Sequence, residues 1–493
     1  MDLLERDHCF NQLAQLLRDA EAGQGQTVLI SGEAGIGKTA LVQQFVNRHR
    51  SEARSLWGAC EALFTPRPLG PLYDIATQVQ GSLFTLMSRD TERPTLFSTF
   101  IDELQKSPLP TIVVFEDVHW ADEATLDLIK FLGRRIPHLP VLFLVTYRDT
   151  EPSPDHPLWS VIGDIPGDSV TRLRLAPLSE KAVACLAHRS HRPAEDLYAI
   201  TGGNPFFVTE VLASDTKGVP LMVRDAVLAR IARVSPAARS LLELASVVPN
   251  RAERWLLAAV LDSDTSALEE CLTNGMLLMD HTTVAFRHEL ARQAIESTLS
   301  PLRQQGLHRQ VLQALLDHPE HSSQAAHLVH HALGAYEGER VARYAPLAAK
   351  QAATQGAHRE AAAHYATALR FADQFPLDRQ AELLEGRAYE CYLINQIEEA
   401  MQARRAALNI WRQLNRPDQV GHTLRWLSRL SWFLGQSGKA EQYANEAVEL
   451  LETLPPDKQL AMAYSNRAQV AMLADDSAEV VRWGELAIAL AES

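Results

Sequence analysis

One segment near the start of the chain combines glycine, lysine and threonine at the spacing of a phosphate-binding loop. Residues 32–39 read Gly-Glu-Ala-Gly-Ile-Gly-Lys-Thr, which fits the pattern G-x4-G-K-[ST]. An apolar strand pattern at 27–31 precedes it and a helical pattern at 39–48 follows, which is the context such a loop requires. We expect Lys38 to contact the β- and γ-phosphates and the Thr39 hydroxyl to bind Mg²⁺. Main-chain groups and the start of the helix would complete the phosphate cradle, at Gly32, Gly35, Ile36, Gly37 and Ala40.

Two carboxylates end a second apolar strand pattern. Residues 111–115 are followed directly by Glu116 and Asp117. Beside a phosphate loop, one such carboxylate orders Mg²⁺, mostly through water, and the other polarises the attacking water. Position in the segment assigns Glu116 to the magnesium and Asp117 to the water, whereas chemistry alone allows the reverse. Both assignments stay open at this point.

A third apolar strand pattern, at 141–147, ends in Arg148. A cation at a strand end beside the phosphate loop is placed to sense a γ-phosphate, so we expect Arg148 to contribute to catalysis. The alternative is a surface arginine that pairs with Asp149 or Glu151.

These strand patterns alternate with helical ones, which predicts a parallel α/β sheet. The 493 residues suggest about three domains. With 47 basic and 61 acidic residues, the net charge is −14, which argues against a chain that binds DNA throughout. The five scattered cysteines form no CxxC pair, and no signal peptide or long apolar run occurs. We therefore expect a cytoplasmic protein with free thiols.

The middle of the chain is mostly helical in pattern. A hairpin-like piece at 277–286 lies between helical segments, with a helix predicted at 289–299, and this order suggests a small winged-helix domain. The predicted domains are an α/β phosphate-loop domain at 1–168, a helical lid at 169–231, a winged helix at 232–310 and an all-helical region at 311–493.

The last third of the chain contains an internal repeat. The pattern Ala361-x3-Tyr365-x2-Ala368 recurs from Ala400, Ala440 and Val480, at intervals of 39, 40 and 40 residues. This period resembles tetratricopeptide-like superhelical repeats, whose period is nearer 34 residues. The last repeat stops without a polar capping helix, so we expect a fragment of a longer chain or an end that a partner covers.

Several segments together resemble the STAND class of signalling ATPases, and in particular the large ATP-binding regulators of the LuxR family, the MalT-like transcriptional activators. The first of these segments is the phosphate loop. The others are Phe-Glu-Asp-Val-His-Trp-Ala-Asp at 115–122, Thr-Tyr-Arg-Asp-Thr-Glu at 146–151 and Thr-Gly-Gly-Asn-Pro-Phe-Phe at 201–207. Cys60 to Leu72 and Val223 to Arg230 are similar as well. The likeness extends over residues 1 to about 310, and the repeats match only in kind.

The resemblance implies a weak ATPase that works as a switch, closed with ADP and open with ATP, with Mg²⁺ as cofactor. It implies that Pro205 packs on the adenine, that Arg6 closes over the base, and that His288 touches the ADP β-phosphate. A structural histidine and a plain helix start are the alternatives for His288 and Pro205.

The resemblance also implies partners. The repeats would bind a small-molecule or protein inducer, and the ATP form would self-associate. DNA would be bound only through a C-terminal helix-turn-helix that this chain lacks, and no membrane is involved. Two alternatives remain: a STAND defence or scaffold ATPase, and an AAA+-like ATPase that binds DNA through its winged helix.

Overall fold

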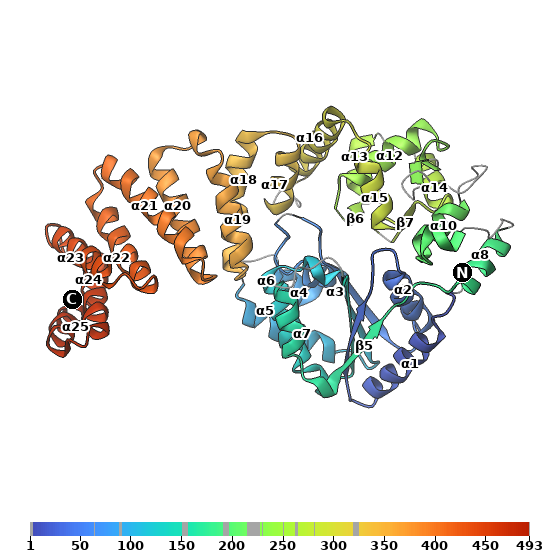
Figure 1. The fold of residues 1–493 in the computed structure, drawn as a ribbon, viewed down its shortest axis with the longest axis horizontal. Helices are drawn as coiled ribbons and strands as arrows, with labels where there is room; N and C mark the ends of the chain where they lie inside the picture. The colour runs from blue at the N-terminus through green and yellow to red at the C-terminus, as the bar shows by residue number, and fades with distance from the viewer. Residues whose placement is uncertain are drawn as a thin grey trace. The chain divides into compact units, whose positions relative to one another are not determined.

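The structure is a computed structural model (Figure 1). It describes residues 3–63, 65–87, 91–149, 156–190, 197–213, 227–228, 230–249, 251–261, 265–280, 282–318 and 325–492. The chain divides into two compact units, which meet in sequence between Tyr336 and Glu337.

The first unit begins with a five-stranded parallel sheet, as predicted. Its strands are β1 (Gln26–Ser31), β2 (Arg54–Ala59), β3 (Thr111–Glu116), β4 (Val141–Tyr147) and β5 (Val170–Arg174). Their order across the sheet is β2-β3-β4-β1-β5, so β4 lies between β1 and β3. Every residue of β3 and β4 is buried, which explains their continuous apolar runs. The carboxyl ends of β1, β3 and β4 therefore lie side by side at one edge.

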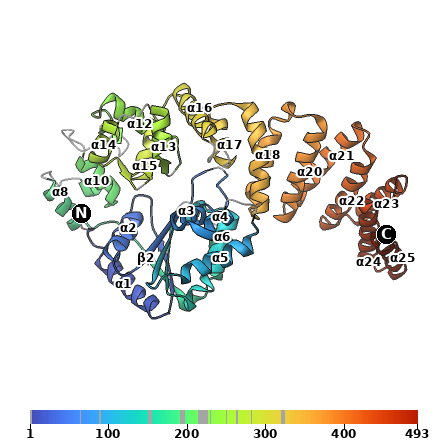
Figure 2. The same ribbon diagram turned by 180° about the vertical axis from the view of Figure 1, so that it is seen from behind.

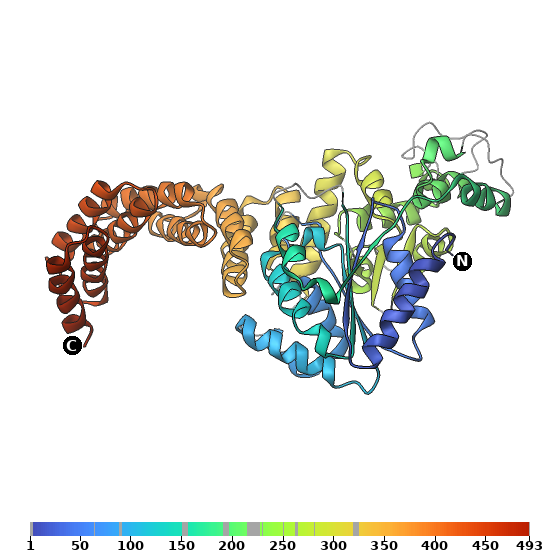
Figure 3. The same ribbon diagram turned by 60° about the horizontal axis from the view of Figure 1, so that its bottom comes forward.

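Helices cover both faces of this sheet. They are α1 (Asp7–Glu21), α2 (Lys38–Arg48), α3 (Gly70–Val79), α4 (Gly81–Met87), α5 (Arg93–Gln105), α6 (Glu123–Gly133) and α7 (Pro157–Asp164). Figure 3 shows the sheet nearly edge-on, with the dark blue helices on one face and the light blue and teal helices on the other. The apolar stripe of α1, including Phe10, Leu13 and Leu17, packs into one core with β1 and β4. This packing fixes the position of the strand ends.

One domain boundary needs correction. The predicted boundary at residue 168 falls before β5, which pairs in parallel with β1 and belongs to the sheet. β5 is an edge strand in which only Leu173 is buried, so it lacks the apolar run that revealed the other strands.

The remainder of the first unit is largely helical. A small apolar cluster joins α8 (Glu180–Arg189), α9 (Leu197–Thr201) and α10 (Pro205–Ala213) through Val183, Leu197 and Val208. Most of the segment at 223–230 that resembles the STAND class lies outside the described residues.

A second, antiparallel sheet has the order β6-β8-β7 and packs with short helices. Figure 1 labels β6 and β7, and Figure 2 shows the helices from behind. Its elements are α12 (Pro236–Ser246), β6 (Arg251–Glu253), α13 (Arg254–Leu261), α14 (Thr265–Thr273), β7 (Leu277–Met279), β8 (Thr283–Phe286) and α15 (Glu289–Glu296). The β7–β8 hairpin is the one that the sequence predicted at 277–286. Two further helices, α16 (Pro301–Asp317) and α17 (Ala325–Gly334), complete the unit.

The second unit consists of four helix pairs that pack each on the next. The helices are α18 (Gly338–Thr354), α19 (His358–Leu369), α20 (Leu377–Leu393), α21 (Ile397–Gln413), α22 (Pro417–Phe433), α23 (Ser437–Leu451), α24 (Lys458–Leu473) and α25 (Ser477–Ala491). The predicted repeat pattern falls on the second helix of each pair, and its alanines are buried in α19, α21 and α23.

The turn inside each helix pair repeats as well. A residue with positive φ stands at Gly356, Asn395, Gly435 and Asp475, each just before the second helix. Glycine, asparagine and aspartate are the residues that most readily adopt this left-handed conformation, so the turn chemistry follows the same period as the alanines.

Within the described part of the chain, no helix has the length and apolar content that crossing a membrane requires.

Asp74 of α3 is a carboxyl whose ionisation makes the stability of the first unit depend on pH. Its Oδ2 accepts a hydrogen bond from the Ala59 N–H at 3.0 Å, and burial raises its pKa to about 7. An unfolded aspartate has a pKa of about 3.9. Because the folded pKa is the higher one, ionisation destabilises the fold progressively as the pH rises from about 4 to about 7.

We therefore expect Asp74→Asn to raise the melting temperature by a few degrees at pH 8 and to leave it unchanged at pH 4. Scanning calorimetry at both pH values measures this. An equal shift at the two pH values would show that charge is not the cause.

Candidate nucleotide-binding site

The predicted phosphate loop links the end of β1 to the start of α2. Gly32, Gly35 and Gly37 have φ values of 147°, 76° and 98°, which residues with a Cβ rarely adopt. The buried Lys38 folds back over the loop, where its Nζ donates to the carbonyls of Gly32 at 2.8 Å and Glu33 at 2.9 Å. The loop therefore holds the lysine ammonium beside its own backbone.

The next residues of the loop face the carboxylate that ends β3. The Thr39 hydroxyl donates a hydrogen bond to Glu116 Oε1, and Trp57 Nε1 donates to Glu116 Oε2 at 3.1 Å. Ile36 is buried and Ala40 half-buried, so the start of α2 is anchored in the domain. A hydroxyl and a carboxylate in contact are hard oxygen ligands that suit Mg²⁺. This contact places Glu116, rather than Asp117, beside Thr39.

Asp117 occupies a different position. It has a φ of 54°, and its N–H donates to Thr146 Oγ1 of β4 at 3.0 Å. Burial, together with the charge of Glu116, raises its pKa to about 7, and the positive charges of Arg148 and Lys38 oppose that rise. A carboxyl with a pKa near neutrality can accept a proton at neutral pH.

Arg148 follows β4, the strand between β1 and β3, and is buried. Its guanidinium lies 4.8 Å from the centre of the Trp120 ring. The surface alternative does not fit, because Asp149 is bonded to Arg174 at 3.0 Å and Arg148 is not at the surface. Glu151 lies outside the described residues.

His119, to which sequence reasoning assigned no role, is part of the same group. Its Nδ1 lies 3.9 Å from Asp117 Oδ1. Burial, with the charges of Arg148 and Lys38, lowers its pKa to about 3, so the imidazole is neutral at neutral pH. The signal in the sequence is a histidine two residues after a strand-end carboxylate.

The turn before α10 is hydrogen-bonded to the phosphate loop. Asn204 Nδ2 donates to the Ala34 carbonyl at 2.9 Å, and the Phe206 N–H donates to the Gly35 carbonyl at 3.2 Å. A Cβ on Gly35 would come within 2.8 Å of Phe206 Cβ, so only glycine allows this close approach. Pro205 begins α10 between these two contacts. Its packing on adenine stays a prediction.

Arg6 is also held at the loop. Its guanidinium is buried and donates to the carbonyls of Ala176 at 2.8 Å and Ile36 at 3.4 Å. The structure thus brings Arg6 to the phosphate loop, and its closure over a base stays a prediction.

His288 lies just before α15, and its ring packs 4.5 Å from the ring of Phe206. Burial, with the charges of Arg287 and Arg230, lowers its pKa to about 3. A neutral imidazole can contact a phosphate only as an N–H donor. The phosphate contact itself stays a prediction, while the packing connects His288 to the turn that touches the loop.

Comparison with known proteins fits this geometry. Residues 2–145 match the family model described as the AAA ATPase domain, a nucleotide-binding domain. A relative from Rhizobium meliloti (strain 1021), an uncharacterized protein, is 28% identical over 388 residues. That match covers 64% of this chain and 37% of the relative, so the chain spans little more than a third of it.

Two solved structures are similar at low sequence identity. A STAND protein with a tetratricopeptide repeat sensor from Pyrococcus horikoshii is 14% identical, with a TM-score of 0.47, over 97% of this chain and 82% of that one. Cdc6p from Pyrobaculum aerophilum is 15% identical, with a TM-score of 0.35, over 61% of this chain and 96% of that one. We therefore base the function on the residues of the site.

Asn204 tests whether the turn before α10 supports the loop. Asn204→Ala removes the hydrogen bond to the Ala34 carbonyl and the one that Asn204 Oδ1 accepts from the Phe206 N–H at 3.1 Å. The bond to the loop contributes about 1 kcal/mol. We expect ADP to bind roughly fivefold more weakly, as measured by titration with a fluorescent ADP analogue. Thr209→Ala is the matched control, because among the described residues the Thr209 hydroxyl donates to the Phe206 carbonyl of its own helix and not to the loop. Equal affinity in both variants would show that the turn does not support binding.

Proposed function

We propose that this chain is an ATP-binding, slowly hydrolysing signal-transduction ATPase of the STAND type, acting as the regulatory part of a LuxR-type transcriptional regulator. The observation that carries the proposal is the pair of hydrogen bonds from Asn204 and Phe206 to the loop carbonyls of Ala34 and Gly35. Through these bonds the element that holds the phosphates is joined directly to α10, outside the sheet.

This connection between the phosphate loop and α10 suits a switch that responds to the bound nucleotide. A γ-phosphate that binds Lys38 and Arg148 in the ATP form, and is lost in the ADP form, gives the two states different contacts. The first turn of α10 is hydrogen-bonded to the phosphate loop, and His288 packs on Phe206 of that helix. A conformational change of the loop is therefore transmitted to α10 and to His288. The ADP state is then the closed form and the ATP state the open one. Turnover is slow because a switch needs long-lived states.

Each residue of the site has a separate role in ATP hydrolysis under this proposal. Thr39 and Glu116 would hold Mg²⁺, which neutralises phosphate charge. Asp117 orients the attacking water and accepts its proton, as its pKa near 7 permits. Lys38 and Arg148 face the charge that develops on the transferred phosphoryl group.

The repeats are the sensor in this proposal, and an inducer binds there. The alternative, DNA binding through the antiparallel sheet, has less support. Its described hairpin exposes Leu278, Met279 and Asp280, which are apolar or acidic rather than basic.

Exchanging each carboxylate for its amide separates the two roles. We expect Glu116→Gln to raise the Mg²⁺ concentration for half-maximal activity about tenfold, because it weakens a metal ligand. We expect Asp117→Asn to keep ATP and Mg²⁺ binding while hydrolysis falls about 10²–10³-fold. ATP binding by calorimetry and phosphate release over a Mg²⁺ series measure both effects, and Lys38→Ala, which loses nucleotide binding, is the negative control.

Two results would contradict the proposal. One is an Asp117→Asn variant that hydrolyses ATP like the wild type. The other is wild-type turnover of tens per second without an effector, because a switch state would not then persist.

A further inference from the structure

In the repeat unit, α21 and α22 pack against each other (Figure 1). Three arginines from these two helices surround one indole. The guanidinium carbons of Arg404, Arg425 and Arg429 lie 5.1, 5.2 and 5.9 Å from the centre of the Trp426 ring. Arg404 comes from α21, and the other two lie on α22 one turn apart. The sequence pattern indicated no binding residue in the repeats, because Arg404 and Trp426 come together only across two helices.

The charge of this cluster is incompletely balanced by its described contacts. Arg404 pairs with Glu385 at 2.7 Å, and Glu385 also accepts the Thr423 hydroxyl. Arg429 donates to the Tyr392 hydroxyl at 2.8 Å, which is a neutral partner. Arg425 is only 8% exposed, and its Nε has no hydrogen-bond acceptor among the described residues.

Burial, with the charges of Arg404 and Arg429, lowers the pKa of Arg425 to about 10. A buried cation with cationic neighbours costs free energy that an anion would offset. The guanidinium fork fits carboxylate or phosphate oxygens, so the cluster is suited to one of these groups.

Exposed aromatic rings adjoin the arginines. Tyr389 is 43% exposed and packs edge-on against Trp426 at 5.7 Å. Phe433, 46% exposed, packs against Tyr392, and Tyr392 packs against Trp426. Rings of this kind provide an apolar platform for a planar ligand.

We propose that this cluster binds a small organic anion, with its carboxylate or phosphate group on Arg425 and Arg429 and its apolar body on Tyr389. The role of this anion as the inducer rests on the proposed function. The binding site itself is inferred only from the contacts and burial of the arginine cluster.

Phenyl phosphate is the probe, used on the full chain without nucleotide. We expect it to raise the melting temperature by several degrees relative to sodium chloride of equal ionic strength. In Arg425→Met the melting temperature without the probe should exceed that of the wild type, because the buried charge is gone, and the response should be lost. Arg412→Met is the control, because Arg412 is exposed and pairs with Glu446.

A wild type that responds to phenyl phosphate no more than to chloride would overturn the site, as would an Arg425→Met variant that keeps the response. The Lys38→Ala chain separates this result from the proposed function. It should keep the anion response even if the nucleotide switch is wrong.

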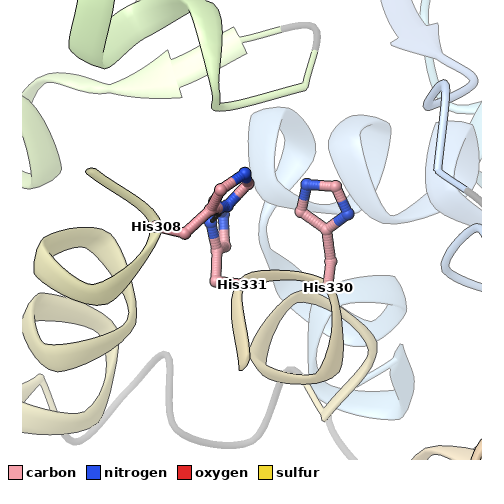
Figure 4. A group of neighbouring side chains, drawn as sticks. All are labelled: His308, His330 and His331. Carbon is pink, nitrogen blue, oxygen red and sulfur yellow. Dashed lines mark hydrogen bonds between the residues drawn. The ribbon is translucent and has the colours of Figure 1, made fainter. Parts of the chain in front are cut away.

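A different observation, in the first unit, carries a second inference. His308 of α16 and His330 and His331 of α17 point toward one another (Figure 4), with ligand nitrogens all within 4.8 Å. Nδ1 of His308 lies 3.0 Å from Nδ1 of His331. Gly334 permits the approach, because a Cβ there would come within 2.4 Å of the His308 ring.

His308 and His331 are buried and His330 is half-buried. Burial lowers the pKa of His308 to about 4 and of His330 to about 3, and lowers that of His331 well below its usual range. Neutral imidazole is the form that ligates Zn²⁺ and similar transition metals. We infer that these histidines form a transition-metal site of the Zn²⁺ type.

Cobalt(II) added to the full chain tests this inference, because a histidine-bound cobalt ion has a visible absorption band. We expect one bound ion, displaced by Zn²⁺, and loss of the band in His308→Ala and in His331→Ala. His364→Ala is the control, since His364 is also a buried histidine with a pKa lowered to about 4. A wild type without the band, or a band that persists in both cluster variants, would overturn the site.

Discussion

The hydrogen bonds between the phosphate loop and the turn before α10 are the constraint on which the functional account depends. They join the carbonyls of Ala34 and Gly35 to Asn204 and Phe206. These contacts connect segments about 170 residues apart in sequence. They require a residue at position 35 with positive φ and no Cβ, so one glycine serves both the loop and the contact.

The order of strands explains why the remaining site residues meet. Because β4 lies between β1 and β3, Arg148 emerges between the phosphate loop and the two carboxylates. The cations and anions there affect each other's protonation: Glu116 raises the pKa of Asp117, and Arg148 lowers it. Burial also leaves His119 uncharged, so the positive charge at this edge comes from Lys38 and Arg148.

Local patterns predicted the parts of this site that depend on spacing along the chain. The loop glycines, Lys38, and the strands ending in Glu116 and Arg148 were predicted because period and motif suffice to place them. The contact of Thr39 with Glu116 favours one of the two assignments that the sequence left open, in which Glu116 lies on the magnesium side. Trp57, which donates to Glu116, gave no local signal, because its partner lies on another strand. Arg404 gave none either, because Glu385 and Trp426 lie on neighbouring helices. β5 was missed since an edge strand has only one buried side chain.

The nucleotide carried by the purified chain tests the central claim most directly. The protein would be denatured and its supernatant resolved by ion-exchange chromatography, with the Lys38→Ala variant in parallel. We predict close to one ADP per wild-type chain and none in the variant, because the loop and the turn together retain the nucleotide. A wild-type site that holds no nucleotide and exchanges ATP freely would contradict the account.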